Sequence, residues 1–390
     1  MSVTIDRQAV PQPLGAAAAG RALLRGMLVL LLLLPGVRGR FQAAGLGWAY
    51  LAALAWTLAF FAVPVMRRLA FFLGALDVPA ARKVHAVPTP LLGGAAVYAA
   101  FAVSVLFNFN FSRGLKGVAV GATIVVTLGV LDDLWDLPAP LKLAGQVAGV
   151  AAAIAYGVTL SVVPSWLPAA FALNVVLTLL WFLTVTNAVQ FLDGMDGLAS
   201  GLGVIAGLFF SISALQTGQP YLFILAAPLV GACLGFLPYN FRRDGARIFL
   251  GDSGASFIGF TLAGLAVMGE WAEDDPIVAL LTPILILAVP LFDIAFIGVV
   301  RVVTGKVHSL QEWLAYTGKD HIHHRFEALG LSKAQSVLLI LFIAGTLGLS
   351  AIQLKQATPR EAVLILIQAG CVLVIIAILE GVGRGRPGRS

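Results

Sequence analysis

Eleven continuous apolar runs occupy most of this chain of 390 residues and limit what it can fold into. A run of about 20 apolar residues crosses a bilayer as a helix, because a helix satisfies its backbone hydrogen bonds within itself. The strands of a membrane barrel would instead alternate polar and apolar residues. The chain is therefore expected to be an all-α polytopic membrane protein with about eleven transmembrane helices. The expected spans are residues 44–66, 91–110, 115–131, 141–158, 169–186, 198–215, 221–240, 253–269, 277–300, 334–352 and 361–380.

The composition agrees with a membrane protein. Soluble domains contain about 25% charged residues, whereas this chain has 11% charged and 59% hydrophobic residues. We divide it into an N-terminal extension (1–43), a membrane domain (44–380) and a basic cytoplasmic tail (381–390). Within the extension, the apolar segment 26–37 is short, which suits a signal-type or interfacial segment better than a full span and leaves its topology open.

The loops between the runs fall alternately on two sides of the membrane. One set contains most of the Lys and Arg residues, and the other contains only Arg113, Lys116, Lys355 and Arg360. Cytoplasmic loops carry an excess of Lys and Arg, so the formal charge of +6 reports orientation and does not indicate a nucleic-acid partner. Every unusual polar motif lies in the basic set of loops. We therefore expect one site, at the cytoplasmic face of a multi-pass protein of the inner (plasma) membrane.

The most informative polar stretch runs from Asn187 to Leu198 and contains two Asp-Gly pairs, at Asp193 and Asp196. A charged Asp at mid-membrane costs about 2.5–3.5 kcal/mol, so such residues usually stay at an interface or serve a site. The glycine after each Asp lets backbone N–H groups approach an anion closely. The stretch predicts a place where backbone amides and a carboxylate-held cation share a phosphate. The alternative is a short polar turn between two helices.

Two further acidic motifs stand at the ends of apolar runs. Asp132 and Asp133 repel each other and oppose the helix macrodipole, so a cation or a basic partner is expected beside them. Lys142 is a candidate partner for a carboxylate or a phosphate. Asp252 enters an apolar run between small residues; close helix packing explains the small residues but not the Asp. A helix N-cap is the alternative explanation for Asp252.

Two basic motifs complete the set. Arg82-Lys83-Val84-His85 precedes two prolines and is expected to form a cationic strap for an anionic substrate, with lipid headgroups as the alternative ligand. The second motif, His321-Ile322-His323-His324-Arg325, suggests a metal site by composition. Oxygen-rich Asp clusters favour Mg²⁺ over zinc, however. Beside an Arg, the histidines fit better as phosphate donors, or one of them as a proton carrier.

Taken in order, these five stretches resemble the polyprenyl-phosphate N-acetylhexosamine-1-phosphate transferases over about residues 44–380. That family includes bacterial undecaprenyl-phosphate GlcNAc-1-phosphate transferases, the phospho-MurNAc-pentapeptide translocase and the eukaryotic dolichyl-phosphate enzyme. The residue sequence of the His-rich motif looks more like that of the bacterial GlcNAc-1-phosphate transferases than that of the MurNAc-pentapeptide branch. One departure is Gln190, where the family usually has Asn; its longer side chain changes the contact to nucleotide or metal.

The resemblance implies a role for each motif residue. The implied cofactor is Mg²⁺, with Mn²⁺ as an alternative, held by Asp252 and Asp193. The carboxylates of Asp132 and Asp133 would position or deprotonate the lipid phosphate, and together with Asp252 they form the implied catalytic set. The implied substrate-binding residues, which line the nucleotide–diphosphate pocket or neutralise phosphates, are Lys83, His85, Asn187, Gln190, Asp193, Asp196, His323, His324 and Arg325.

The resemblance also implies the reaction. Such enzymes transfer a sugar-1-phosphate, here most simply GlcNAc-1-phosphate, from a UDP-sugar to polyprenyl (undecaprenyl) phosphate and release UMP. The product, a polyprenyl-diphosphate-sugar, is the first lipid-linked intermediate of a cell-surface glycan such as a cell-wall polysaccharide. The alternatives are a phospho-MurNAc-pentapeptide transferase and an anion transporter, although the charges collect at one face and not at the midplane that a transporter uses. The donor sugar, the prenyl length and a homodimeric state are left open.

Overall fold

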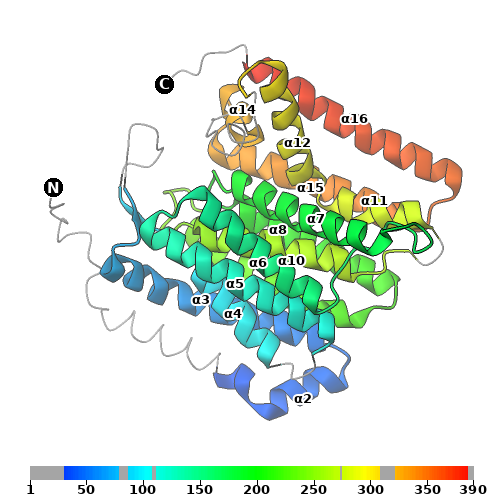
Figure 1. Ribbon diagram of the computed structural model, residues 1–390. Coiled ribbons are helices and arrows are strands. Elements are labelled where there is room, and N and C mark those ends of the chain that lie inside the picture. The colour runs from blue at the N-terminus through cyan, green and yellow to red at the C-terminus, as the bar shows by residue number, and fades with distance from the viewer. Residues whose placement is uncertain (1–29, 79–86, 108–110, 273–274, 308–320, 385–390) are drawn as a thin grey trace.

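The computed structural model describes residues 30–78, 87–107, 111–272, 275–307 and 321–384, and its long helices run roughly parallel in one bundle (Figure 1). Among the described residues, eight helices are long and apolar enough to cross a membrane, which confirms the class of fold that the apolar runs predict. They are α3 (Gly47–Leu73), α5 (Arg113–Trp135), α7 (Ala170–Leu192), α8 (Leu198–Gln216), α9 (Phe223–Asn240) with the turn η2 (Pro220–Leu222) before it, α10 (Gly251–Met268), α15 (Lys333–Leu354) and α16 (Pro359–Arg384).

The other expected spans are helical but shorter or bent. Helices α4 (Gly93–Leu106) and α6 (Ala139–Ala155) are too short to pass the same test. The straight span expected for 277–300 is wrong, because α11 (Pro276–Ile286) and α12 (Ala288–Val303) meet at an angle of 82°. Prolines at 283 and 290 flank this break, and each removes a backbone N–H donor from the helix. The total of eleven spans stays a prediction.

The segment 26–37 does not continue as a long helix in the part that the structure describes. Helix α2 (Pro35–Ala43) is only nine residues long and begins at a proline. Leu32 is buried against the first turns of α3, where the Tyr50 hydroxyl donates a 2.9 Å hydrogen bond to the Leu32 carbonyl. The described end of this segment is therefore packed onto α3.

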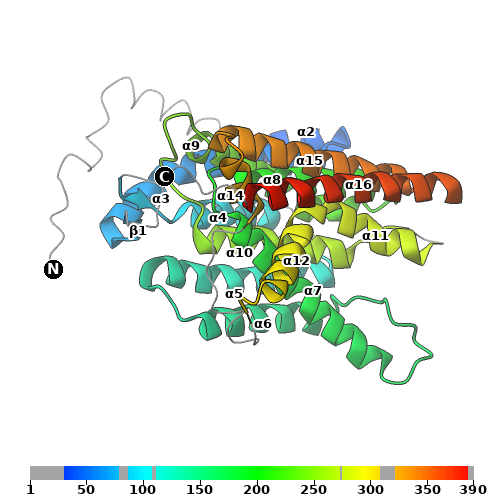
Figure 2. The same cartoon turned by 90° about the horizontal axis from the view of Figure 1, so that it is seen from above.

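Helix α10 lies at the centre of the bundle, with α5, α6 and α7 to one side and α15 and α16 to the other (Figure 2). It contacts α4, α5, α7, α8 and α9, and nearly all of its side chains are buried. Glycines allow this close approach. A Cβ built on Gly94 of α4 would lie 2.1 Å from the Gly254 nitrogen of α10, and one on Gly129 of α5 would lie 2.4 Å from the Ser253 Cα. The first turn of α10 is therefore held between α4 and α5.

Replacing Gly94 with Ala is expected to destabilise the fold by about 3 kcal/mol, because the new methyl group would meet backbone atoms that cannot rotate away. The control is Gly345→Ala on α15, where an added Cβ meets nothing within 4 Å; alanine there should be neutral or stabilising by about 0.5–1 kcal/mol. Thermal unfolding in detergent measures both. Equal midpoints for the two variants would contradict the close packing of α4 on α10.

A small antiparallel ribbon joins the same end of the bundle. Its strands are β1 (Leu76–Asp77) after α3 and β2 (Thr89–Pro90) before α4, with Leu76 paired to Pro90. The segment before α10 continues this pairing: the Phe249 amide donates to the Pro90 carbonyl at 2.8 Å, and the Gly94 amide donates to the Leu250 carbonyl at 2.7 Å. The backbone thus ties two loops of the basic set together, the one between α3 and α4 and the one before α10.

Candidate active site

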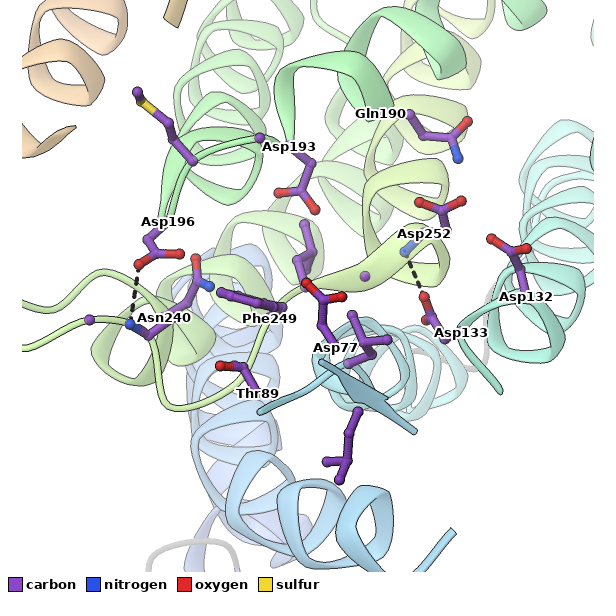
Figure 3. Close-up of a pocket in the computed structure, with 18 of the residues that line it drawn as sticks. Asp77, Thr89, Asp132, Asp133, Gln190, Asp193, Asp196, Asn240, Phe249 and Asp252 are labelled. Carbon is purple, nitrogen blue, oxygen red and sulfur yellow. Dashed lines mark hydrogen bonds between the residues drawn. The ribbon is translucent and has the colours of Figure 1, made fainter. Parts of the chain in front are cut away.

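A cavity of about 1170 Å³ opens at this end of the bundle, where the loops of the basic set meet. Figure 3 shows acidic side chains from several separate segments gathered around it. Its carboxylates come from the β-ribbon, the end of α5, the loop after α7, the loop before α10, the start of α10 and the helix α14 (Ile322–Ala328). They are Asp77, Asp132, Asp133, Asp136, Asp193, Asp196, Asp244, Asp252 and Glu327. The prediction that the polar motifs converge in one place is therefore met for the acidic motifs.

Lys142 joins two of these carboxylates. Its ammonium nitrogen lies 2.6 Å from Asp132 Oδ2 and 3.0 Å from Asp252 Oδ2. The turn between α5 and α6 places it there: Asp136 has a positive φ of 49°, and the Leu137 amide donates to Asp132 Oδ1 at 2.7 Å. One cation from the first turn of α6 thus links the end of α5 to the start of α10.

Asp133 faces the other way and holds the N-terminus of α10. Its carboxylate accepts hydrogen bonds from the Asp252 amide at 2.8 Å, the Ser253 amide at 3.3 Å and the Ser253 hydroxyl at 2.6 Å. Gly251 has a φ of +74°, and a Cβ there would lie 2.7 Å from the Asp133 oxygens. Asp133 on α5 therefore caps α10, and Asp252 does not serve as the N-cap of its own helix.

Asp193 follows α7 and faces the cavity. Within the described residues its carboxylate has no hydrogen-bond or ion-pair partner. Burial raises its pKa well above the usual value, and the nearby negative charges of Asp252, Asp133 and Asp196 raise it further. A divalent cation at this point would offset the repulsion between these carboxylates.

Asp196 and Asn240 order the loop around Asp193. The Asp196 carboxylate accepts a 3.1 Å hydrogen bond from the Ala246 amide. The Asn240 side chain, at the end of α9, accepts from the Gly197 amide at 2.6 Å and donates to the Ile248 carbonyl at 3.1 Å. The Asp-Gly loop and the loop before α10 therefore form one hydrogen-bonded unit.

Three amide side chains form a network beside the cavity. Gln146 on α6 donates to Gln190 at 3.0 Å and accepts from Asn187 at 2.8 Å, both on α7. Gln190 also lines the main cavity, whereas Asn187 does not and donates instead to the Leu183 carbonyl. The longer Gln at position 190 thus reaches across to α6.

The three histidines of the His-rich motif have different surroundings in the structure. His321 Nδ1 lies 2.7 Å from Asp293 Oδ2, and the Ile322 amide donates to Asp293 Oδ1 at 2.8 Å. His323 is buried against Gly194, and burial followed by the charges of His324 and His321 lowers its pKa well below the usual value. This imidazole is therefore neutral at physiological pH, and its expected role in neutralising phosphate stays a prediction. His324 lines the cavity, 3.7 Å from Glu327.

Asp293→Ala on α12 is expected to destabilise the packing of this motif by about 2–4 kcal/mol. The reason is that the His321 ring and the Ile322 amide each lose a short hydrogen bond to a buried carboxylate. Hydrogen–deuterium exchange over 321–330 should become faster. Asp293→Asn keeps an acceptor for the Ile322 amide and should have a smaller effect. Unchanged exchange in the Ala variant would show that Asp293 does not anchor the motif.

Three other expected site residues remain. Lys83 and His85 are outside the described residues, and Arg325 on α14 (Ile322–Ala328) is not among the residues that line the cavity. The expectation that Lys142 pairs with a carboxylate is confirmed by its contacts with Asp132 and Asp252. The structure adds Gln146, Asn240 and Phe249, which the motif analysis did not assign to the site and which line it.

The donor set fits Mg²⁺. Among the residues that the structure describes, no three His, Cys, Asp or Glu side chains form a complete metal site by themselves. Mg²⁺ is usually held by one or two carboxylates together with substrate phosphates. Asp193, which has no partner among the described residues, and Asp252, whose partner is the one-third exposed Lys142, can supply those one or two oxygens.

The chain is similar in sequence to known proteins. Residues 117–270 match the family described as glycosyl transferase family 4. The chain is 35% identical over 324 residues to the probable undecaprenyl-phosphate N-acetylglucosaminyl 1-phosphate transferase of Bacillus subtilis. This match covers 82% of this chain and 88% of the relative. It is 33% identical over 365 residues to the decaprenyl-phosphate N-acetylglucosaminephosphotransferase of Mycolicibacterium smegmatis (85% and 88%).

A relative of another branch matches as well. The chain is 32% identical over 327 residues to the phospho-N-acetylmuramoyl-pentapeptide-transferase of Symbiobacterium thermophilum, over 77% of this chain and 93% of the relative. All three relatives are named as transferases, and the chain has the apolar helices of a multi-pass membrane protein. With the matches extending over most of both chains, the protein belongs to the family of polyprenyl-phosphate N-acetylglucosamine-1-phosphate transferases.

Proposed function

We propose that this enzyme transfers GlcNAc-1-phosphate from UDP-GlcNAc to a polyprenyl phosphate and releases UMP. The observation that carries the proposal is the group of carboxylates bridged by Lys142 at one end of a membrane bundle. A lipid phosphate and a nucleotide diphosphate are both anions, so their reaction needs fixed cations and a metal where they meet. The N-acetylglucosaminyl names of two relatives and the His-rich motif favour GlcNAc over MurNAc-pentapeptide as the sugar.

The reaction proceeds by one displacement at phosphorus. An oxygen of the lipid phosphate bonds to the sugar-bearing phosphorus, and the bond from this phosphorus to the bridging oxygen of UMP breaks. Lys142 attracts the lipid phosphate and neutralises charge as the two anions approach. Asp132 fixes the ammonium group of Lys142 by its 2.6 Å contact. A phosphate with a second pKa near 6 is largely deprotonated already, so positioning matters more than proton removal.

Other residues position these groups. Asp133 holds the first turn of α10 and thereby the carboxylate of Asp252. The Asp196–Asn240 unit shapes the loop that is proposed to contact the nucleotide, with Phe249 offering an apolar ring at the cavity wall. Asp193 and Asp252 would hold Mg²⁺, which supplies charge neutralisation for the diphosphate when bound.

We place the cavity at the cytoplasmic face of the inner membrane, because the basic loops surround it and a nucleotide donor is cytoplasmic. The acceptor is a membrane lipid, so its phosphate reaches the cavity at the level of the headgroups.

Purified enzyme in liposomes tests the proposal directly. With labelled UDP-GlcNAc, polyprenyl phosphate and Mg²⁺, UMP and a lipid-extractable label are expected in equal amounts. Turnover of UDP-MurNAc-pentapeptide in place of UDP-GlcNAc would assign the chain to the other branch. Uptake of label into the vesicles without release of UMP would instead identify a transporter.

A further inference from the structure

Three arginines lie together outside the cavity, at the end of α3 and in the loop before α10. Arg67 and Arg68 are adjacent on α3. Arg247 is held beside this helix, because its amide donates to the carbonyl of Tyr239, whose hydroxyl donates to the Phe60 carbonyl of α3. The positive charges of Arg247 and Arg68 act on the Arg67 guanidinium group.

Arg67 also stands over the Phe71 ring, with 5.6 Å from its central carbon to the ring centroid. Its Nε is buried and has no hydrogen-bond partner among the described residues. Like charges beside a buried, unsatisfied donor are unfavourable unless an anion joins them.

The carboxylate in the same loop as Arg247 is already paired. Asp244 accepts two hydrogen bonds from Arg242, at 2.8 and 2.9 Å, and these hold its pKa below the usual value, with a smaller contribution from Arg247. The exposed side chain of Arg243 adds a further positive charge to the same loop. This surface therefore carries excess positive charge that its own carboxylate does not balance.

The outer face of α3 at this level is apolar. Val65, Leu69 and Phe72 are exposed by 57%, 39% and 86%. Arg68 lies three residues after Val65 and four before Phe72, so it belongs to the same helical face. An arginine within an exposed apolar stripe near the end of a spanning helix is at the depth where acyl chains give way to headgroups.

We propose that Arg67, Arg68 and Arg247 bind the phosphate of an anionic phospholipid, whose acyl chain lies along Val65, Leu69 and Phe72. The phosphodiester would accept hydrogen bonds from the exposed guanidinium groups of Arg68 and Arg247 and would offset the positive charge of Arg67 behind them. None of the three arginines is among the residues that line the reaction cavity, so this lipid is distinct from the polyprenyl substrate.

The proposed site is connected to the reaction cavity through the backbone. The Arg247 amide donates to the Tyr239 carbonyl at 2.9 Å, and the preceding residue, Ala246, donates to Asp196. A lipid that holds Arg247 would therefore also order the loop that fixes Asp196. We therefore expect the KM for the UDP-sugar to fall as the anionic lipid content rises. This expected effect on KM rests on the proposed function.

Lipid retention tests the binding site without any need for activity. Delipidated protein is mixed with equal amounts of phosphatidylglycerol and phosphatidylcholine and examined by native mass spectrometry. The wild type should retain phosphatidylglycerol selectively. The double variant Arg67→Gln/Arg247→Gln should bind it about 20-fold more weakly, since each cation near a headgroup contributes a factor of about 5. The control is Arg113→Gln/Lys116→Gln, which removes the same charge from the opposite end of α5 and should match the wild type.

Three results would overturn the proposal. They are equal retention of the two lipids by the wild type, the same loss in the control pair, and stabilisation by inorganic phosphate alone equal to that by phosphatidylglycerol. If the Gln variant fails to fold, Arg67→Lys/Arg247→Lys keeps the charge and should retain the lipid within about threefold. A normal UMP assay with no lipid selectivity would reject this site and leave the enzymatic function standing.

Discussion

Replacing Asp252 with Asn is expected to lower turnover by at least about a hundredfold while the protein still inserts and folds. The amide keeps the size of the carboxylate and can still accept a hydrogen bond from Lys142. It loses the negative charge that is proposed to hold Mg²⁺ beside the diphosphate. The capping of α10 is unaffected, because Asp133 and not Asp252 provides it. A folded protein with a low kcat and a raised Mg²⁺ requirement is the expected result.

The control for this substitution is Glu270→Gln, just after the other end of α10. Glu270 is exposed and is not among the residues that line the cavity. Its turnover should stay within about twofold of the wild type. Rates of UMP release across a Mg²⁺ titration, together with size-exclusion profiles, compare the two variants. Wild-type turnover in purified Asp252→Asn would remove this residue from the metal site and reopen the assignment of every carboxylate around it.

Lys142→Met should have the second-largest effect, a fall in turnover of about a hundredfold. Among the described residues, Lys142 is the one cation within ion-pair distance of both Asp132 and Asp252. Without it, two carboxylates face each other unneutralised and the lipid phosphate loses its positive partner. Because Lys142 is one-third exposed, the loss of stability is limited to about 1–2 kcal/mol in the absence of metal.

The metal dependence of stability gives a second measurement for Lys142→Met. Added Mg²⁺ should raise the unfolding midpoint of the variant more than that of the wild type, since the cation takes over the neutralisation of Asp132 and Asp252. Lys306→Met, which removes an exposed lysine after α12, should show neither change. If Mg²⁺ stabilised the variant and the wild type equally, the carboxylates would not form the proposed metal-binding pair.

The sequence motifs predicted more of the site than the helix pattern predicted of the fold. Ionisable residues in or beside spanning helices are costly and usually serve a site, so Asp132, Asp193 and Asp252 were expected to share one. Helix lengths were less certain: α4 and α6 are shorter than a full span, and the prolines near Leu287 bend what hydropathy alone shows as one continuous run.

The sequence of a motif did not show which role each of its residues has. Asp132 and Asp133 are adjacent in the chain, yet one faces Lys142 and the other caps α10, because successive residues of a helix point about 100° apart. His321 and His323 are likewise two residues apart, but one is anchored by Asp293 and the other is buried beside Gly194.

The sequence by itself determined the membrane class and the main acidic residues of the cavity, because the cost of placing charge in hydrocarbon restricts where such residues can occur. Only the tertiary structure decided which carboxylate caps a helix, which one faces a cation and that Asp293 holds the His-rich motif. These roles depend on contacts between different helices, some of them far apart in the chain: Asp293 and His321 are 28 positions apart, and Asp133 and Asp252 are 119 apart. Close packing around Gly94 and Gly254 sets that geometry, and no local pattern encodes it.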